Sequence, residues 1–380
     1  MTQDDMSKRI AHVTSAHCFS DVRIHLREAV SMRKFGYDVH IIALYNSVTN
    51  KKSPTQIQAH KVHLVGKHIP RSRLTRATIG AFKVFIKSLR LRPDIVIMHD
   101  PELIPYTLLY RIIGIKVIFD AHEDFIKQNL TKVWVIGWKK VIVNLLGKLL
   151  FLIANNFSNQ IFAATSKVAA SYNENKTTIV RNFPVKGDIQ QIDPSKSMKS
   201  HDFIYIGGIS ERRGIIKILD AIQKNQNIEI LHLAGRFENE DFKNACLAHP
   251  GWKKVLYHGF LNRSEINAIM ARSRCGLVTL LDTPNHRASI PVKLLEYQEA
   301  GLPIIASNFE EWKTFVNNGV YGVAVEPNSS HEISSAIDYL CNNDTWYSIH
   351  NNIKTTSCFT WVTEEKKIRT VMSRLLNDPN

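Results

Sequence analysis

Residues 203–234 read F-I-Y-I-G-G-I-S-E-R-R-G-I-I-K-I-L-D-A-I-Q-K-N-Q-N-I-E-I-L-H-L-A, and this stretch decides the fold. The apolar runs 203–206 and 228–234 predict two short strands, and the apolar spacing of 214–224 predicts a helix between them. A strand–helix–strand unit predicts a parallel sheet covered by helices. The strands are continuously apolar rather than alternating, so we expect the sheet to be buried on both faces.

The same alternation extends in both directions along the chain. The further strands that we expect are 9–14, 38–44, 94–98, 116–119, 255–257, 276–280 and 304–306. The further helices that we expect are 21–35, 77–91, 105–113, 264–271 and 292–300. The segment 186–200 is polar, lacks periodicity and contains Pro194, which is typical of a linker. The sequence therefore predicts an α/β chain with two doubly wound, Rossmann-like domains, 1–185 and 201–360, that face each other across a ligand-binding cleft.

The composition is that of a globular protein. The chain has 380 residues, of which 44% are hydrophobic and 22% charged, which excludes a disordered or collagen-like protein. Its five cysteines are odd in number, scattered and without C-x-x-C spacing, so a disulfide framework and a zinc site are not expected. The polar first residues lack the pattern of a secretory signal, and we expect a cytoplasmic protein.

The net charge of +15 lies entirely in the first half of the chain. Residues 1–190 hold 28 basic and 13 acidic side chains, whereas residues 191–380 hold 21 of each. Residues 51–92 alone carry eleven basic side chains and no acidic one. Such asymmetry predicts an anionic partner, unless it is only a solvated basic face.

The most apolar stretch is 133–157, which is interrupted by Lys139, Lys140 and Lys148. No stretch reaches the roughly 20 uncharged apolar residues of a membrane span. Two interpretations remain: a helix that lies on a membrane surface, with Trp134 and Trp138 beside it, or a buried core helix. With the basic first half, the first interpretation predicts docking on anionic lipid at the inner face of the cytoplasmic membrane.

One candidate binding segment is A-S-I-P-V-K-L-L-E-Y-Q-E-A-G-L-P-I-I-A-S, residues 288–307. Pro291 suits the first turn of a helix and Gly301 suits the residue just beyond its end. The free N–H groups at this helix start are suited to a phosphate. Glu296 has apolar neighbours, where a carboxylate needs a partner; a ribose diol is one, and an exposed helical glutamate is the alternative.

A second candidate is Y-I-G-G-I-S-E-R-R-G, residues 205–214, at a strand–helix junction. Gly207 and Gly208 permit close backbone approach, and Arg212 and Arg213 provide guanidinium groups for an anion. This junction does not have the pattern G-x-G-x-x-G, and the sequence contains no P-loop motif. Both observations disfavour a dinucleotide-binding or P-loop protein.

The third candidate is a group of histidines and carboxylates that follow two first-domain strands, in M-H-D-P-E-L and F-D-A-H-E-D. We expect all of them at the rim of the cleft, where they are suited to metal binding, acid–base work or hydrogen bonds to a sugar. No Asp-x-Asp pair or H-E-x-x-H motif is present among them, which favours hydrogen bonding over a metal. The group consists of His99, Asp100, Glu102, Asp120, His122, Glu123 and Asp124.

Together these segments resemble the GT-B-fold glycosyltransferases of family 4, which are retaining enzymes that use nucleotide sugars. The resemblance covers the whole chain and includes G-G-I-S-E-R-R-G and E-A-G-L-P-I-I-A-S. The stretches H-D-P-E-L-I-P, V-I-F-D-A-H-E-D-F and S-I-P-V-K-L-L-E-Y resemble a bacterial subset that builds surface polysaccharides such as O-antigen or capsule. The helix after Trp361 resembles the family's final helix, which crosses back onto the first domain, here 361–380.

The resemblance implies roles for particular residues. Arg213 stands at the family's diphosphate-binding Lys/Arg position, whereas Gly208 replaces its other basic residue. Glu296 is the second glutamate of the family's E-x7-E motif, and Ala288 replaces the first, whose contact Arg287 or Ser289 would have to supply. His122 matches the histidine that contacts the donor sugar. The catalytic residues expected are thus His122, Arg213 and Glu296, and the donor-binding residues Gly207, Gly208, Arg212, Arg213, Ser289, Ile290, Pro291 and Glu296.

The resemblance further implies a donor such as a UDP- or GDP-sugar, a saccharide or lipid-linked saccharide acceptor, and no cofactor or metal. Two alternatives remain open. A nucleotide-sugar epimerase with the same overall fold would need the first-domain carboxylates for proton removal and elimination. A nucleic-acid-binding protein is suggested only by the basic first half; because 51–92 contains only Phe82 and Phe85 as aromatic residues and no nucleic-acid-reading motif, we expect no nucleic acid partner.

Overall fold

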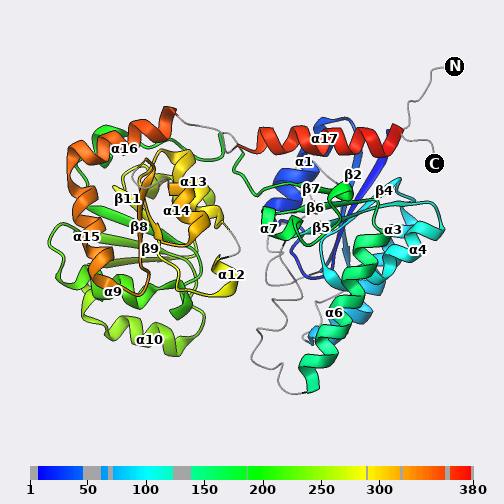
Figure 1. The fold of residues 1–380 in the computed structure, drawn as a ribbon, viewed down its shortest axis with the longest axis horizontal. Helices are drawn as coiled ribbons and strands as arrows, with labels where there is room; N and C mark the ends of the chain where they lie inside the picture. Colours follow the sequence, from blue (N-terminus) through cyan, green and yellow to red (C-terminus); the bar gives the residue numbers. More distant parts are fainter. Residues whose placement is uncertain are drawn as a thin grey trace. The chain divides into compact units, whose positions relative to one another are not determined.

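The computed structural model describes residues 7–45, 61–66, 72–122, 138–185, 187–287, 290–316, 320–355 and 360–377. The chain divides into two compact units (Figure 1). Unit 1 comprises Met1–Asn182 together with Trp361–Asn380, and unit 2 comprises Phe183–Thr360. Each is an α/β unit built on one parallel sheet, as the strand–helix alternation predicts.

The unit 1 sheet has seven strands in the order β3-β2-β1-β4-β5-β6-β7. Its central strands are fully buried, and their side chains form one core with the helices. The strands are β1 (Arg9–Thr14), β2 (Asp38–Leu44), β3 (Lys61–Val65), β4 (Ile95–Met98), β5 (Lys116–Ala121), β6 (Gln160–Ala163) and β7 (Thr177–Ile179). Every described pairing between them is parallel.

Helices cover the unit 1 sheet. Two of the predicted helices begin with π-helical turns, Val22–Ala29 before α1 and Arg76–Gly80 before α3. The helices are α1 (Val30–Lys34), α2 (Arg73–Thr75), α3 (Ala81–Arg90), α4 (Thr107–Ile112), α6 (Trp138–Phe157), α7 (Ser166–Ala169) and α17 (Trp361–Asn377). The final helix α17 belongs to this unit, where the Trp361 indole donates a 2.7 Å hydrogen bond to Ser31 Oγ.

The unit 2 sheet has six strands in the order β10-β9-β8-β11-β12-β13. Because the order reverses beside β8, the carboxyl ends of β8 and β11 form a switch point where loops can enclose a ligand. The strands are β8 (Asp202–Ile206), β9 (Ile230–Ala234), β10 (Val255–Gly259), β11 (Cys275–Val278), β12 (Ile304–Ser307) and β13 (Gly322–Val325).

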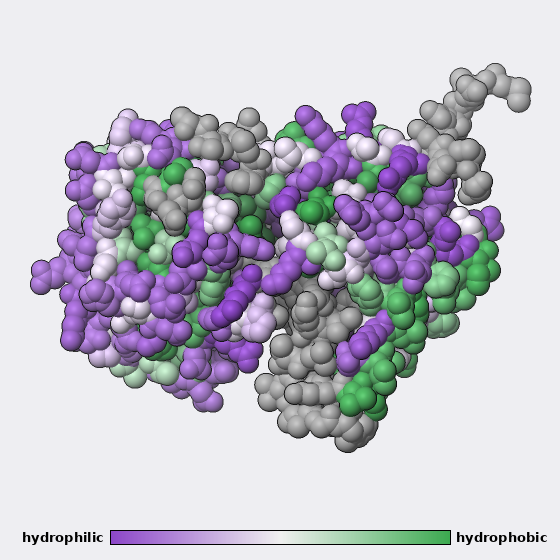
Figure 2. Space-filling model, viewed as in Figure 1, coloured by the Kyte–Doolittle hydropathy of each residue, from purple (hydrophilic) through white to green (hydrophobic). Residues whose placement is uncertain are grey.

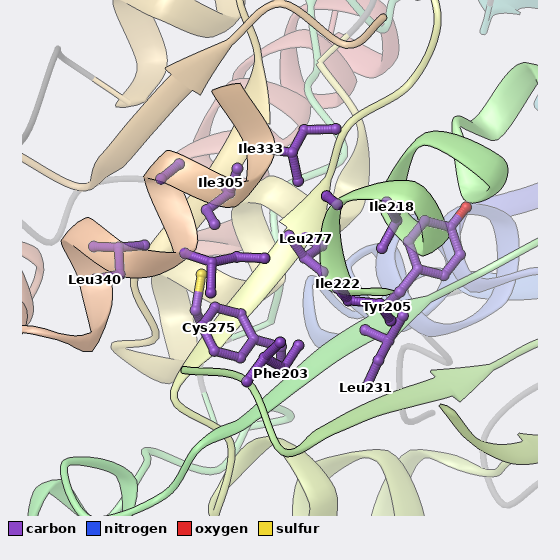
Figure 3. Packing of buried hydrophobic residues seen from close by; sticks show 14 of the residues in the cluster. Phe203, Tyr205, Ile218, Ile222, Leu231, Cys275, Leu277, Ile305, Ile333 and Leu340 are labelled. Atoms are coloured by element: carbon purple, nitrogen blue, oxygen red, sulfur yellow. The ribbon is translucent and has the colours of Figure 1, made fainter. Parts of the chain in front are cut away.

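Unit 2 has two hydrophobic clusters, as expected for a sheet that is buried on both faces. In one of them Phe203, Leu231 and Leu277 from the sheet pack against Ile218 and Ile333 from helices (Figure 3). The helices are α8 (Pro194–Ser197), α9 (Ile215–Lys224), α10 (Glu240–Ala248), α11 (Arg263–Met270), α12 (Pro284–Arg287), α13 (Val292–Ala300), α14 (Glu310–Val316), α15 (Ser330–Cys341) and α16 (Asn343–Thr355).

The segment expected to be a linker, 186–200, differs from that expectation. Its described residues belong to unit 2. Ile189 and Ile192 are buried in the second cluster of that unit, and the Ile192 N–H donates to the Ala300 carbonyl. Asp193 caps the short helix α8. Ile189, Ile192 and the partly buried Met198 thus join this polar segment to the core of unit 2.

Candidate functional site

The turn after β8 is shaped by glycines with positive φ angles. Gly207 has φ 135° and Gly214 has φ 71°. A Cβ atom on Gly214 would lie 2.0 Å from the Thr279 carbonyl oxygen, so this glycine lets the turn pack on the segment after β11. The Leu281 N–H also donates to the Arg212 carbonyl at 3.0 Å. The turns that follow β8 and β11 therefore lie side by side, as predicted for a ligand site.

Arg212 and Arg213 lie in the 3₁₀ turn Glu211–Arg213 that leads into α9. Arg212 is exposed and Arg213 is half-buried. Within the described part of the chain, neither has an acidic side chain within ion-pair distance. Burial lowers the pKa of His286 of α12, and the charges of Arg213 and Arg212 lower it further, against the hydrogen bond of its ring to the Leu281 carbonyl. This edge of the sheet thus carries excess positive charge.

Helix α13 begins and ends as predicted, over Val292–Ala300. Pro291 precedes it with φ −62°, and Gly301 ends it in the left-handed region with φ 76°. Ile290 and Pro291 are partly buried, whereas Ser289 and Ala288 lie outside the described residues. Since Pro291 has no N–H, the free donors at this end start at Val292.

Glu296 is buried in α13, being 7% exposed. The sequence suggests a ribose as its partner, but the structure already provides one within the protein. Nη2 of Arg263, the first residue of α11, lies 2.6 Å from Glu296 Oε1. Arg263 was missed by the sequence analysis, since only the fold brings α11 beside α13. Oε2 of Glu296 has no hydrogen bond to the described residues.

Lys293, also missed, lies against the glycine turn. A Cβ atom on Gly207 would be 2.3 Å from Lys293 Cε and 2.4 Å from its Nζ. Burial, followed by the charge of Arg213, lowers the pKa of Lys293 to about 8, against the opposing charge of Glu296. The only sequence signal was a lysine in the first turn of a helix, where a cation is unfavourable.

The unit 1 candidates form a buried network rather than a row of groups at a rim. His99, Asp100 and Asp120 are at most 2% exposed. Asp120 accepts hydrogen bonds from Arg23 Nη2 at 2.6 Å and Nε at 2.9 Å, and lies 3.0 Å from His99 Nδ1. Although burial acts in the opposite direction, the Arg23 charge holds the pKa of Asp120 well below its usual range. The expectation that His99, Asp100 and Asp120 line a cleft rim is therefore wrong.

Arg23 and Glu28, from the π-helical turn before α1, complete this network. Arg23 Nε lies 3.0 Å from Glu28 Oε1, and both side chains are buried. Burial, reinforced by Asp120, raises the pKa of Glu28 well above its ordinary value. Nothing in the sequence pattern marks either residue, because a helical arginine and glutamate usually lie in solvent.

His122, unlike His99, Asp100 and Asp120, is partly exposed, with 21% of its side chain accessible. Its Nε2 lies 2.9 Å from Asp120 Oδ2, and its ring stacks on His17 with centroids 5.2 Å apart. His17 Nδ1 lies 2.8 Å from Asp100 Oδ1. Burial disfavours the charged form of His17, but Asp100 outweighs it and raises the pKa of His17 to about 9. His122 is thus held between a carboxylate and a cationic imidazole.

The remaining members of the group lie elsewhere. Glu102 pairs with Arg76 at 3.3 Å, and Glu123 and Asp124 lie outside the described residues. Ligand atoms of His99, Asp120 and His122 lie within 4.8 Å of one another, as do those of His12, Glu28 and His99. Both sets adjoin the Arg23 guanidinium, whose charge disfavours a metal cation there. The donor set therefore fits a hydrogen-bonded network better than a metal.

The sequence matches one family model. Residues 188–356, most of unit 2, match the family described as Glycosyl transferases group 1. No curated protein matches the chain. The family match favours a transferase over an epimerase.

Several solved structures share the fold over nearly the whole chain. HepE from Anabaena, in complex with UDP and glucose, has a TM-score of 0.74 at 14% identity, covering 96% of this chain and 99% of that one. Sucrose-phosphate synthase from Thermosynechococcus elongatus has a TM-score of 0.75 at 12% identity, covering 97% and 99%. The apo lipopolysaccharide outer core galactosyltransferase WaaB has a TM-score of 0.61 at 12% identity, covering 96% and 99%.

These likenesses confirm the predicted fold class, two Rossmann-like domains of the GT-B type. Residues 188–356 match the Glycosyl transferases group 1 family, and this match confirms the prediction that the chain is a glycosyltransferase.

Proposed function

We propose that the protein is a retaining glycosyltransferase of family 4 that transfers a sugar from a UDP- or GDP-sugar to a saccharide or lipid-linked saccharide. Its place would be in bacterial surface-polysaccharide assembly, as the sequence resemblance implies. One observation carries the proposal: Arg212 and Arg213 lie in the turn after β8, which meets the segment after β11, and α13, with its buried Glu296, packs Lys293 against the same turn. That combination suits a diphosphate attached to a ribose.

Each residue has a distinct role in the proposal. Arg213, with Arg212 beside it, holds the diphosphate and stabilises the charge that develops as the nucleotide departs. Gly208 leaves open space beside the turn, whereas the space over Gly207 holds the Lys293 side chain. The segment of Ser289, Ile290 and Pro291 leads into the free N–H groups of α13. Glu296 binds the ribose through Oε2. His122 contacts the transferred sugar, held in place by Asp120 and His17.

The relatives support the choice of donor. HepE was solved with UDP-glucose as well as with UDP, and WaaB is described as a lipopolysaccharide outer core galactosyltransferase. We further propose that transfer needs no metal, because Arg213 and the start of α13 can neutralise the leaving diphosphate.

We also propose that unit 1 docks peripherally on the anionic inner face of the cytoplasmic membrane. The surface involved, here called the α6 surface, consists of Val141, Ile142, Leu145, Leu146, Leu149 and Leu152 of α6 with Leu109, Ile112 and Ile113 beside them. All nine side chains are exposed, and Figure 2 shows hydrophobic residues gathered over α6 and α4. The opposite side of α6, with Ala154, packs into the core. Helix α6 is therefore not a buried core helix.

Basic side chains accompany the α6 surface. Lys148 of α6 and Arg111 of α4 are exposed. Among the described helices, none is long and apolar enough to cross a membrane. Of the basic run 51–92, only the described residues 61–66 and 72–92 can be placed. An exposed apolar face bordered by cations is typical of a helix that lies in the membrane interface.

A thermal-shift panel of UDP-, GDP-, ADP- and CMP-sugars on the full chain tests the donor proposal. A true donor at a hundred times its dissociation constant should stabilise the protein by about 2.7 kcal/mol. Transfer of the sugar from that donor to acceptors in a membrane extract should then persist in EDTA. Loss of transfer in EDTA and its recovery with manganese would contradict the metal-independent mechanism, and no response to any nucleotide sugar would contradict the donor class.

A further inference from the structure

We propose that Lys293 is the second diphosphate-binding cation of this site, supplied from α13 rather than from the glycine turn. The inference rests on the proposed function, because it assigns a residue to the same nucleotide-sugar site.

The position of the ammonium group follows from the glycine that it covers. Lys293 Cε and Nζ lie 2.3 and 2.4 Å from where a Cβ of Gly207 would be. Gly207 directly follows the last residue of β8, so the lysine head lies at the carboxyl end of that strand. The lysine side chain thus connects the first turn of α13 with the turn that carries Arg213. A side chain at position 207 would displace the ammonium group.

The charges around Lys293 are unbalanced. Within the described part of the chain it has no hydrogen bond or ion pair. The nearest acidic group on its own helix is Glu296, which is already paired with Arg263. The other charge that acts on it is that of Arg213, which repels it. Two half-buried cations without an acid between them, next to a helix N-terminus, are unfavourable unless an anion joins them.

A diphosphate fits this arrangement better than a singly charged anion. A diphosphate has two linked phosphate groups, so Arg213 of the turn can bind one of them and Lys293 of α13 the other. The lowered pKa of Lys293, about 8, is what such a half-buried cation shows when its anion is absent.

The alternative is that Lys293 only packs its aliphatic stem over the bare glycine backbone. Lys293→Met separates the two roles, because methionine keeps an unbranched stem but removes the charge. Lys293→Arg keeps the charge. The exposed Lys313 of α14 has no ion pair among the described residues and provides a matched control, Lys313→Met.

A second-site variant makes the test sharper. A Cβ on Gly208 would meet nothing within 4 Å, and the residue is exposed. An arginine at position 208 can therefore be accommodated next to the place where the ammonium group lies. In the Lys293→Met background, Gly208→Arg should restore a cation from the turn itself.

The experiment measures binding of UDP, GDP, ADP and CDP to the full chain by titration calorimetry, followed by competition with the nucleoside of the diphosphate that binds best. Lys293→Met should weaken binding of the diphosphate about ten- to a hundredfold, the effect of losing one charged hydrogen bond, and leave binding of the nucleoside within twofold. Lys313→Met should resemble the wild type, and Lys293→Arg, which keeps the charge, should lose less diphosphate affinity than Lys293→Met. Gly208→Arg should recover at least about tenfold of the lost affinity.

Unliganded thermal unfolding verifies that each variant folds, and Lys293→Gln replaces Lys293→Met if the latter does not. Wild-type affinity of Lys293→Met for the diphosphate would overturn the inference while leaving the donor proposal intact. An equal loss for nucleoside and diphosphate would also overturn it, in favour of a packing role. A wild-type protein that binds none of the four diphosphates would overturn the donor proposal itself, and this inference with it.

Discussion

Arg263 Nη2 lies 2.6 Å from Oε1 of Glu296, so a residue at the start of α11 neutralises the buried carboxylate of α13. The Arg263 side chain is 41% exposed, whereas that of Glu296 is 9% exposed. The pair explains how Glu296 tolerates burial without a ligand, because removing a carboxylate from water is costly unless a partner replaces the water. It also orients the carboxylate, and it leaves Oε2 for a ribose hydroxyl.

The first prediction separates these two roles of Glu296. Glu296→Ala should weaken binding of the preferred nucleoside diphosphate about ten- to a hundredfold, because it removes a charged hydrogen bond worth about 1.5–3 kcal/mol. It should also abolish the preference for the ribonucleotide over its 2′- and 3′-deoxy analogues, measured by calorimetry. If Glu296→Ala still preferred the ribonucleotide over its 2′- and 3′-deoxy analogues as the wild type does, the carboxylate would be only the structural partner of Arg263.

The second prediction concerns Arg213. Arg213→Ala should weaken binding of the nucleoside diphosphate by about the same factor but leave binding of the nucleoside unchanged, since its proposed contact is with phosphate. Because Arg213 is half-buried and Arg212 exposed, Arg212→Ala should have a smaller effect on the same calorimetric titration. If Arg212→Ala had the larger effect, Arg212 and not Arg213 would be the main phosphate-binding residue.

The fold was predictable where strands are central and buried. The bounds expected for β1, β2 and α13 are those observed, because continuous apolar runs and terminal glycines mark them in the sequence. The buried strand β6 was missed, and so were β3, β7 and β13, each at an edge of its sheet. Edge strands bury less, and the half-exposed T-T-I of β7 therefore carries little pattern.

The site was predictable only in its local parts. The glycine turn with Arg213 and the start of α13 are contiguous in sequence, so their spacing identifies them. Lys293 against Gly207 and Arg263 against Glu296 join separate strand–helix units, and only the packed sheet brings them together. The unit 1 histidines were predicted as a group, but their burial depends on Arg23, which comes from a helix far earlier in the chain.

The third prediction concerns His122. His122→Ala should retain nucleoside diphosphate binding, measured by calorimetry, while transfer falls by at least about a hundredfold, the usual effect of removing one preorganised group at the reacting centre. His122→Asn keeps a hydrogen-bonding group, so its rate of transfer should fall less than that of His122→Ala. Equal losses of binding and transfer in His122→Ala would instead indicate a histidine whose role is structural.

The fourth prediction concerns the pH dependence of unfolding. The pKa of His17 is about 9 in the folded protein, against an ordinary value of 6.5, so the folded state binds this proton more tightly. Its contribution to the free energy of unfolding is full below pH 6.5 and is lost as the pH rises through 9. Urea unfolding of the wild type and of His17→Asn should therefore differ most near pH 6 and converge near pH 10.

The control for His17 is His331→Asn, at an exposed position of α15. It should follow the wild type at every pH. A gap between wild type and His17→Asn that stays constant from pH 6 to pH 10 would show that the pairing of His17 with Asp100 does not depend on a proton.

The last prediction concerns the α6 surface. Its residues Val141, Leu145, Leu149 and Leu152 recur at intervals of three or four, so they form one stripe along the helix. Apolar insertion and attraction between cations and anionic lipid add together at such a surface, and each basic residue near it contributes roughly 1 kcal/mol. Removal of the apolar stripe should therefore weaken binding even where the charges are kept.

Co-sedimentation with phosphatidylglycerol vesicles should be strong at low salt and fall steeply by ~0.5 M, where the Debye length is only a few ångströms. Binding to neutral phosphatidylcholine vesicles should be weak. Leu145→Glu with Leu149→Glu should abolish the interaction, because two carboxylates in the stripe oppose both insertion and the lipid charge. Leu247→Glu, at an exposed position of α10 in unit 2, should leave it unchanged. If the wild type stays in the supernatant at low salt, or sediments equally with both lipids, the apolar stripe serves a protein partner instead of an anionic membrane.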